Sequence, residues 1–156
     1  MKQNRIKGWM FVAVQFTFSP IVVVLAYLEH NSGAHSSSDL NLIISVILFA
    51  LSLIIGLSAV VNFKQWVTPV PVPRLNSKFV KRGIYSVIRH PMYLSVILFV
   101  FSCLIYFQAV CTLIPFLLLI YFFTRKIVFE EKLLVEKFPG YKSYQSETKK
   151  LLPYVY

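Results

Sequence analysis

Three long apolar runs, separated by polar segments, set the pattern of this sequence of 156 residues. The first two cover residues 9–28 and 40–63. About twenty consecutive apolar residues cross a bilayer as a helix, so each of these runs predicts one transmembrane helix. The third run covers residues 93–123. As one helix, its roughly thirty residues would extend ~45 Å, which exceeds the ~30 Å hydrocarbon core.

The excess length of the third run predicts a break near Gln108, with a short helix on each side. This gives an all-α, polytopic membrane protein with about four transmembrane helices, the last two forming a short hairpin. We expect a single membrane domain. It would comprise two spans in residues 1–63, a cytoplasmic connector in 64–92, and the hairpin with a cofactor-binding region in 93–156.

The polar sequence after the third run predicts a cytoplasmic amphipathic helix. In "TRKIVFEEKLLVEKF", Ile127 and Glu131 fall on one apolar arc and Glu130 lies at its border. Pro139-Gly140 is expected to end this helix. The tail "YKSYQSETKKLLPYVY" is basic and aromatic, a composition suited to an anionic headgroup surface.

Charge supports a membrane location and sets the orientation. Only 14% of residues are charged, against about 25% in soluble domains. The net charge of +10 would suggest nucleic acid in a soluble protein, but the polar segment 29–39 contains no Lys or Arg. All basic residues can therefore share one side, which predicts that both termini are cytoplasmic. The lipid bilayer is the expected partner, and nucleic acid is not.

The segment "GIYSVIRHPMYLS" is the first candidate site. Pro91 suits the first position of a helix, so His90 lies at its N-cap and Arg89 just before it, with Tyr85 and Tyr93 on either side. Free N–H groups at a helix start favour an anion, and an arginine adds a bidentate fork for a carboxylate or phosphate. The alternative is an arginine that snorkels to the membrane edge.

The second candidate is the pair Glu130-Glu131. A carboxylate on an apolar face at the membrane boundary is costly unless it is paired. It would bind a cationic ligand, a hydroxyl or a protein arginine, and the structural alternative is a salt bridge to Arg89 or Arg82. The sequence contains no G-x-G-x-x-G, no P-loop and no Cys/His metal spacing, so we predict no metal site and no Rossmann-type nucleotide domain.

Together these segments carry a resemblance. "GIYSVIRHPMYLS", followed by "FEEKLLVEKFPGYKSYQSETKKLLP", resembles the isoprenylcysteine carboxyl methyltransferase family and its bacterial relatives, which are related to phospholipid methyltransferases. The resemblance implies a helical membrane bundle in a bacterial inner membrane. It also implies a pocket for S-adenosylmethionine, released as S-adenosylhomocysteine, at the cytoplasmic helix ends. The cofactor-binding residues would be Tyr85, Arg89, His90, Tyr93, Glu130 and Glu131, with Arg89 and Glu131 catalytic.

Two positions depart from the family pattern. Ser95 stands where the family has a glycine, and Ile84 stands where proline is common. A small serine would still permit close approach of a cofactor, or it would mark altered affinity or a divergent activity.

The function expected from these features is S-adenosylmethionine-dependent methyl transfer to a lipophilic acceptor. A carboxylate acceptor needs no base and would be held by Arg89, whereas a thiol or amine would use Glu131 as a base if burial raises its pKa. The alternatives are an NADPH-dependent membrane sterol-type reductase, which carries a similar Arg-His-x-x-Tyr segment, and a non-enzymatic membrane scaffold. The sequence leaves the acceptor and the oligomeric state open.

Overall fold

A computed structural model describes residues 2–33, 38–63 and 80–152. Within these residues every regular element is helical, as predicted. In chain order the elements are α1 (Lys2–Ser32), α2 (Asp39–Phe63), the short 3-10 helix η2 (Gly83–Ser86), α3 (Pro91–Phe107), α4 (Leu113–Lys137) and α5 (Tyr141–Glu147). Most of the predicted connector, including its prolines at 69, 71 and 73, lies outside the described residues.

Helices α1 and α2 are long and apolar enough to cross a membrane, and they contain the two predicted spans. Large apolar side chains point away from the bundle on both, as Phe16 and Leu57 do with 65% of their surface exposed. In water such exposure would be unfavourable, whereas hydrocarbon is the natural surrounding of these faces.

The predicted break in the third apolar run is confirmed. Helix α3 ends at Phe107, and Gln108 follows with a left-handed φ of 54°. The N–H of Gln108 donates to the carbonyls of Leu104 and Ile105, which closes the last turn of α3. Helix α4 then runs without interruption from the apolar segment into the charged one, and it ends at Lys137 before Pro139.

The turn between α3 and α4 is bound to the far end of α1. The Glu29 carboxylate accepts hydrogen bonds from the N–H groups of Cys111 (2.7 Å) and Thr112 (2.9 Å) and from the Thr112 hydroxyl (2.7 Å). These groups lie at the start of α4, where N–H groups have no partner within the helix. One step along α1, Nδ1 of His30 lies 3.0 Å from the carbonyl oxygen of Phe107. The tip of the hairpin therefore lies at the end of α1 opposite the N-terminus.

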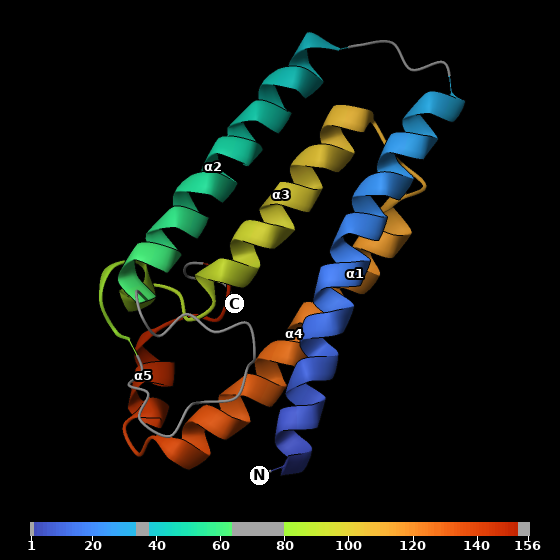
Figure 1. Ribbon diagram of the computed structural model, residues 1–156. Helices are drawn as coiled ribbons and strands as arrows, with labels where there is room; N and C mark the ends of the chain where they lie inside the picture. The colour runs from blue at the N-terminus through green and yellow to red at the C-terminus, as the bar shows by residue number, and fades with distance from the viewer. Residues whose placement is uncertain (1, 34–37, 64–79, 153–156) are drawn as a thin grey trace.

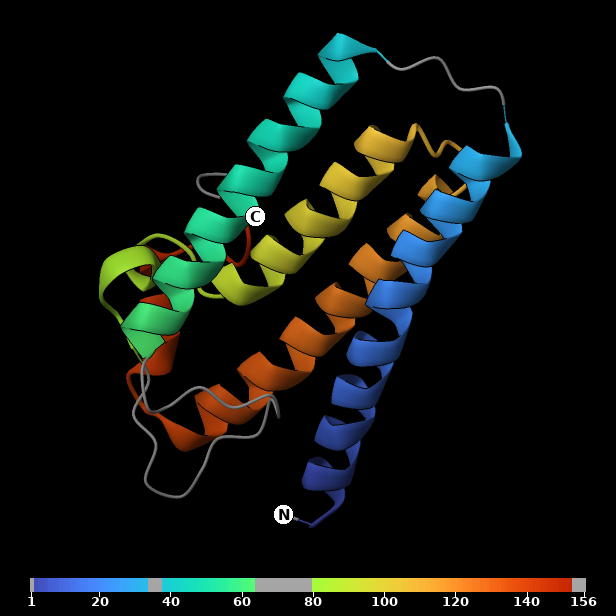
Figure 2. The ribbon, with the colours of Figure 1, turned by 45° about the horizontal axis from the view of Figure 1, so that its top comes forward.

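Helix α3 lies between α1 and α2, while α4 runs along α1 and diverges toward α5 (Figures 1 and 2). One buried apolar cluster joins α1, α3 and α4; it contains Val22, Ala26, Val100, Leu104, Ala109, Phe116, Leu119 and Phe123. A smaller cluster joins the segment before α3, α3 itself, α4 and the tail; it contains Ile88, Leu94, Ile127 and Leu151. This second cluster holds together the segments that carry the candidate site.

Candidate active site

The segment before α3 is held by the C-terminal tail. Ile88 and Lys149 form an isolated parallel bridge. The N–H groups of Arg89 and His90 donate to the carbonyls of Lys149 (2.8 Å) and Lys150 (3.0 Å). Pro91 is at the start of α3, as predicted. The N–H groups of Arg89 and His90 are therefore not free, because carbonyl oxygens of the tail accept their hydrogen bonds.

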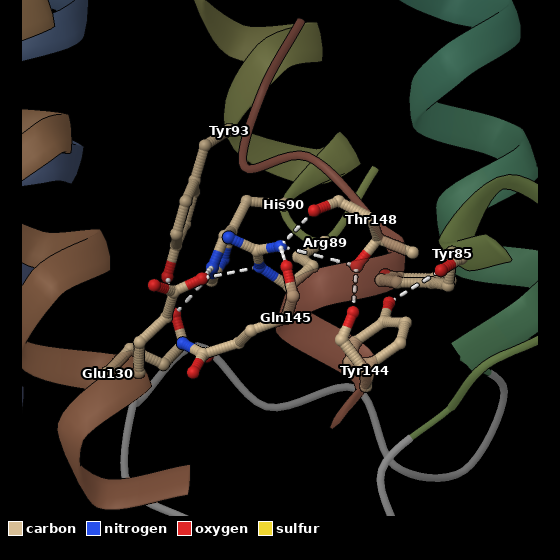
Figure 3. Close-up of polar contacts among 9 residues, drawn as sticks. Tyr85, Arg89, His90, Tyr93, Glu130, Tyr144, Gln145 and Thr148 are labelled. Atoms are coloured by element: carbon tan, nitrogen blue, oxygen red, sulfur yellow. Dashed lines mark hydrogen bonds and ion pairs between the residues drawn. The ribbon is translucent and has the colours of Figure 1, made fainter. Parts of the chain in front are cut away.

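Arg89 is buried, with 9% of its surface exposed, and it does not snorkel toward solvent. Its Nε donates to Oε1 of Glu131 at 2.6 Å. One terminal nitrogen, Nη1, donates to the carbonyls of Gln145 (3.0 Å) and Thr148 and lies 3.3 Å from the Thr148 hydroxyl. Figure 3 shows the guanidinium surrounded by these partners. The arginine thus joins the start of α3, helix α4 and the tail.

Glu131 is buried on α4 and is held as an anion. It accepts the Arg89 bond, and Nε2 of His90 lies 3.4 Å from the same carboxylate oxygen. Burial alone would raise the pKa of Glu131, but the hydrogen bonds from His90 and Arg89 outweigh it, so the pKa lies below its ordinary value. The condition for Glu131 to act as a base, a pKa raised by burial, is therefore not met. Ile127, one helical turn before Glu131, is buried as well.

Glu130 is the more open of the two carboxylates. Its side chain is 24% exposed, against 9% for that of Glu131. The Tyr93 hydroxyl donates to Oε2 of Glu130 at 2.8 Å, and Nδ1 of His90 lies 3.6 Å from the same oxygen. The rings of His90 and Tyr93 stack with centroids 5.5 Å apart and planes 5° from parallel. His90 therefore contacts both glutamates, and the Tyr93 ring lies next to Glu130.

Tyr85 is the predicted site residue that stands apart. Figure 3 shows it on the side of Arg89 away from Tyr93 and Glu130. Its ring packs against Phe63 with centroids 5.5 Å apart, and its carbonyl accepts a hydrogen bond from the Tyr144 hydroxyl at 2.5 Å. The structure thus brings together five of the six predicted residues: Arg89, His90, Tyr93, Glu130 and Glu131. Tyr85 lies apart from them, on the other side of Arg89.

The tail contributes residues that the sequence did not single out. Tyr141, Tyr144 and Thr148 are buried, so one side of the described tail packs into the protein. Burial raises the pKa of Tyr144 to about 12, which keeps its hydroxyl protonated and able to donate. The spacing of residues in "YKSYQSET" could have indicated this burial. Tyr141, Tyr144 and Thr148 recur at intervals of three and four residues, which places them on one face of a helix.

Ser95 faces α2 rather than the glutamates. Its hydroxyl donates to the carbonyl of Met92 in the preceding turn at 2.8 Å. A Cβ placed on Gly56 of α2 would lie 3.3 Å from this hydroxyl oxygen. The serine that replaces the family glycine is therefore accommodated by a glycine on the neighbouring helix.

Comparison with known sequences gives one family. Residues 40–140 match the model of a family described as phospholipid methyltransferase. The matched region contains α2, α3, α4 and every predicted site residue, and it confirms the resemblance to membrane methyltransferases. No curated protein and no solved structure matches the chain.

Proposed function

The chain belongs to the phospholipid methyltransferase family of membrane methyltransferases, and we propose that it transfers a methyl group from S-adenosylmethionine to a lipophilic acceptor at the cytoplasmic membrane face. The observation that carries this proposal is the open carboxylate of Glu130 beside the stacked rings of His90 and Tyr93. A carboxylate next to aromatic faces suits a ligand that is cationic and contains a ring.

The residues present fit S-adenosylmethionine. Glu130 would hold its ammonium group or its ribose hydroxyls, because charged acceptors make the stronger hydrogen bonds. The half-buried ring of Tyr93, stacked on His90, would contact the adenine through its exposed edge, since aromatic rings also pair edge to face. Arg89 and His90 would lie next to its carboxylate, with Glu131 fixing the direction of the guanidinium. When bound, the cofactor supplies an electrophilic methyl group on its sulfonium.

The chain's own contribution is alignment and exclusion of water, which an in-line displacement at carbon needs most. Arg89 and the tail would limit the access of water on one side, and Tyr93 would do so on the other. Glu131, held as an anion, offsets the charge of Arg89, and its lowered pKa makes it a weaker base than an ordinary glutamate. A carboxylate acceptor, which is already deprotonated, suits this arrangement without any base; a thiol or amine would have to reach the site deprotonated.

The proposed topology has four crossings, with both termini on the cytoplasmic side of a bacterial inner membrane. Its support is the bond between Glu29 and the hairpin turn at Cys111 and Thr112. If α1 crosses the bilayer, the turn bound to its far end reaches the opposite side. Helix α4 then returns its polar end, from about Thr124 onward, and Glu130 to the cytoplasmic edge.

The Arg89–Glu131 ion pair also suits a scaffold, since it joins three segments. Substitution of Arg89 lowers stability on either reading, so it does not separate a scaffold from an enzyme. Glu130 is better suited to separate them, because its side chain is 24% exposed and it lies outside the network that joins Arg89, Glu131 and the tail. The methyltransferase family gives no support to a sterol-type reductase.

The test is equilibrium binding of S-adenosylmethionine to the purified, folded protein by calorimetry. We expect Glu130→Gln to weaken binding by roughly tenfold, since a hydrogen bond to a charged group contributes about 1.5–3 kcal/mol. Glu136→Gln, a change at an exposed glutamate of the same helix, serves as the control and should bind as the wild type does. Absence of binding to folded wild-type protein would refute the proposal.

A further inference from the structure

Lys126 is a buried cation that the proposed function does not use. Only 1% of its surface is exposed. It lies on α4 four residues before Glu130, so the two share one face of the helix, with Lys126 one turn nearer the apolar half. Lysine is almost never fully buried unless it is paired, so its place beside the site calls for an explanation.

The contacts of Lys126 are a ring face and an amide. Its Nζ lies 4.8 Å from the centroid of the Tyr93 ring and donates to Oε1 of Gln15 on α1. Within the described residues, the ion pairs closer than 4.0 Å belong to Arg89 and His90, and none includes Lys126. The ammonium is therefore held by neutral groups from two other helices, and the charge of Glu130, one turn along α4, also attracts it.

Tyr93 connects this cation to the site. One ring contacts Lys126, stacks on His90 and packs against Phe123 at a centroid distance of 5.4 Å. The hydroxyl of the same residue donates to Glu130 at 2.8 Å. Any displacement of the Tyr93 ring thus moves the donor that orients the open carboxylate.

We propose that Lys126 is a positioning residue: through its ammonium it fixes the ring of Tyr93, and through Tyr93 it fixes the carboxylate of Glu130. Gln15 completes the chain of contacts. Because Gln15 lies before residue 40, helix α1 contributes to the site from outside the matched region of the family. That Glu130 binds S-adenosylmethionine rests on the proposed function. The contact between Lys126 and Tyr93 does not depend on it.

The physical basis is that a desolvated ammonium over an aromatic face attracts the ring more strongly than one in water does. Methionine at position 126 would fill a similar volume without charge, so the ring would lose this attraction. We expect Lys126→Met to bind S-adenosylmethionine roughly tenfold more weakly. Arginine keeps the charge and also stacks on aromatic rings, so Lys126→Arg should recover most of the affinity.

The experiment has two readouts on the full chain. The first is the dissociation constant of S-adenosylmethionine for the wild type, Lys126→Met and Lys126→Arg, with thermal unfolding measured in parallel. Lys132→Met, at an exposed lysine of the same helix, is the matched control and should be unchanged. The second is the NMR signal of ring-labelled Tyr93, assigned with Tyr93→Phe and recorded without cofactor; Lys126→Met should shift it and Lys132→Met should not.

Gln15→Leu is the second variant, since Lys126→Met changes a buried site and would be uninformative if it did not fold. It removes only the amide partner and should shift the Tyr93 signal in the same direction by a smaller amount. An unchanged Tyr93 signal in both variants, or wild-type affinity in folded Lys126→Met, overturns the inference. A shifted signal in a protein that binds no S-adenosylmethionine instead refutes the proposed function and leaves the positioning of Tyr93 standing.

Discussion

At the scale of single residues, Arg89 shows both what sequence reasoning reaches and where it stops. Its place before a helix-starting proline, next to a histidine, marked it as a candidate, and the cost of an unpaired carboxylate at the membrane boundary marked Glu130 and Glu131. Its other partners, Gln145 and Thr148, lie more than fifty positions away along the chain. No local pattern connects such residues, because only the packing of the tail against the start of α3 brings them together.

Arg89 carries the first prediction. Arg89→Met leaves the buried Glu131 without its ion-pair partner, so we expect a loss of about 3–5 kcal/mol in the free energy of unfolding. Arg89→Lys keeps the charge but loses the planar fork, so its free energy of unfolding should lie between those of the wild type and Arg89→Met. Denaturant unfolding in detergent measures this, with Arg82→Met at an exposed arginine as the control. Equal stabilities of Arg89→Met and the wild type would show that Arg89 does not hold α4 and the tail against the start of α3.

Glu131 carries a prediction about pH. Its pKa is lower in the folded protein than its ordinary value of 4.5, so the folded state favours the anion. The stability that this contributes is present above about pH 4.5 and is lost as the pH falls through the folded pKa. We expect the free energy of unfolding of the wild type to fall more steeply below pH 4.5 than that of Glu131→Gln. Parallel pH profiles of the two proteins would show that the carboxylate is not held as an anion.

At the scale of helices, the apolar pattern predicted where the chain turns, and the length argument placed the break at Gln108, where α3 ends. The pattern did not predict which helices approach most closely. The substitution of serine for the family glycine at Ser95 was visible in the sequence, but its counterpart, Gly56, was not. Gly56 lies in α2, thirty-nine positions before Ser95. Only the contact between α2 and α3 shows that these two residues meet.

We predict that Gly56 and Ser95 are energetically coupled. A side chain on Gly56 meets the Ser95 hydroxyl, so Gly56→Val should cost about 1–3 kcal/mol through overpacking. In the double variant with Ser95→Gly, part of that loss should be recovered. Unfolding measurements on the two single variants and the double variant give the coupling energy, and Ala50→Val on the exposed side of α2 is the control. Strictly additive effects would show that the two helices do not meet at these residues.

At the scale of the whole molecule, the distribution of charge and the hydrogen bonds of Glu29 favour the same membrane topology. The absence of basic residues from segment 29–39 predicts that this segment lies outside the cytoplasm. Glu29 then binds the α3–α4 turn at that same end, so the turn is expected on the outer side. The sequence predicted an all-helical chain and the break in its third apolar run, whereas helix α5, the docking of the tail and the burial of Lys126 depend on contacts between distant segments.

Labelling of cysteines from either side tests this topology. Cys111 is exposed at the hairpin turn, and Ser146 is exposed on α5. In a Cys103→Ala background, a membrane-impermeant maleimide should react with Cys111 only from the outer side. In a protein without native cysteines, Ser146→Cys should react only from the cytoplasmic side. Labelling of both positions from the same side would rule out four crossings and place the hairpin on one surface of the membrane.

The proposed function is transfer of a methyl group from S-adenosylmethionine to a lipophilic acceptor through the site at Glu130. Its test incubates membranes containing the protein with methyl-labelled S-adenosylmethionine and follows the label into the extracted lipid fraction. We expect labelled lipid with the wild type and with Glu136→Gln, and at least tenfold less with Glu130→Gln. Label that stays in the aqueous fraction with folded wild-type protein, or equal labelling by Glu130→Gln, would contradict it.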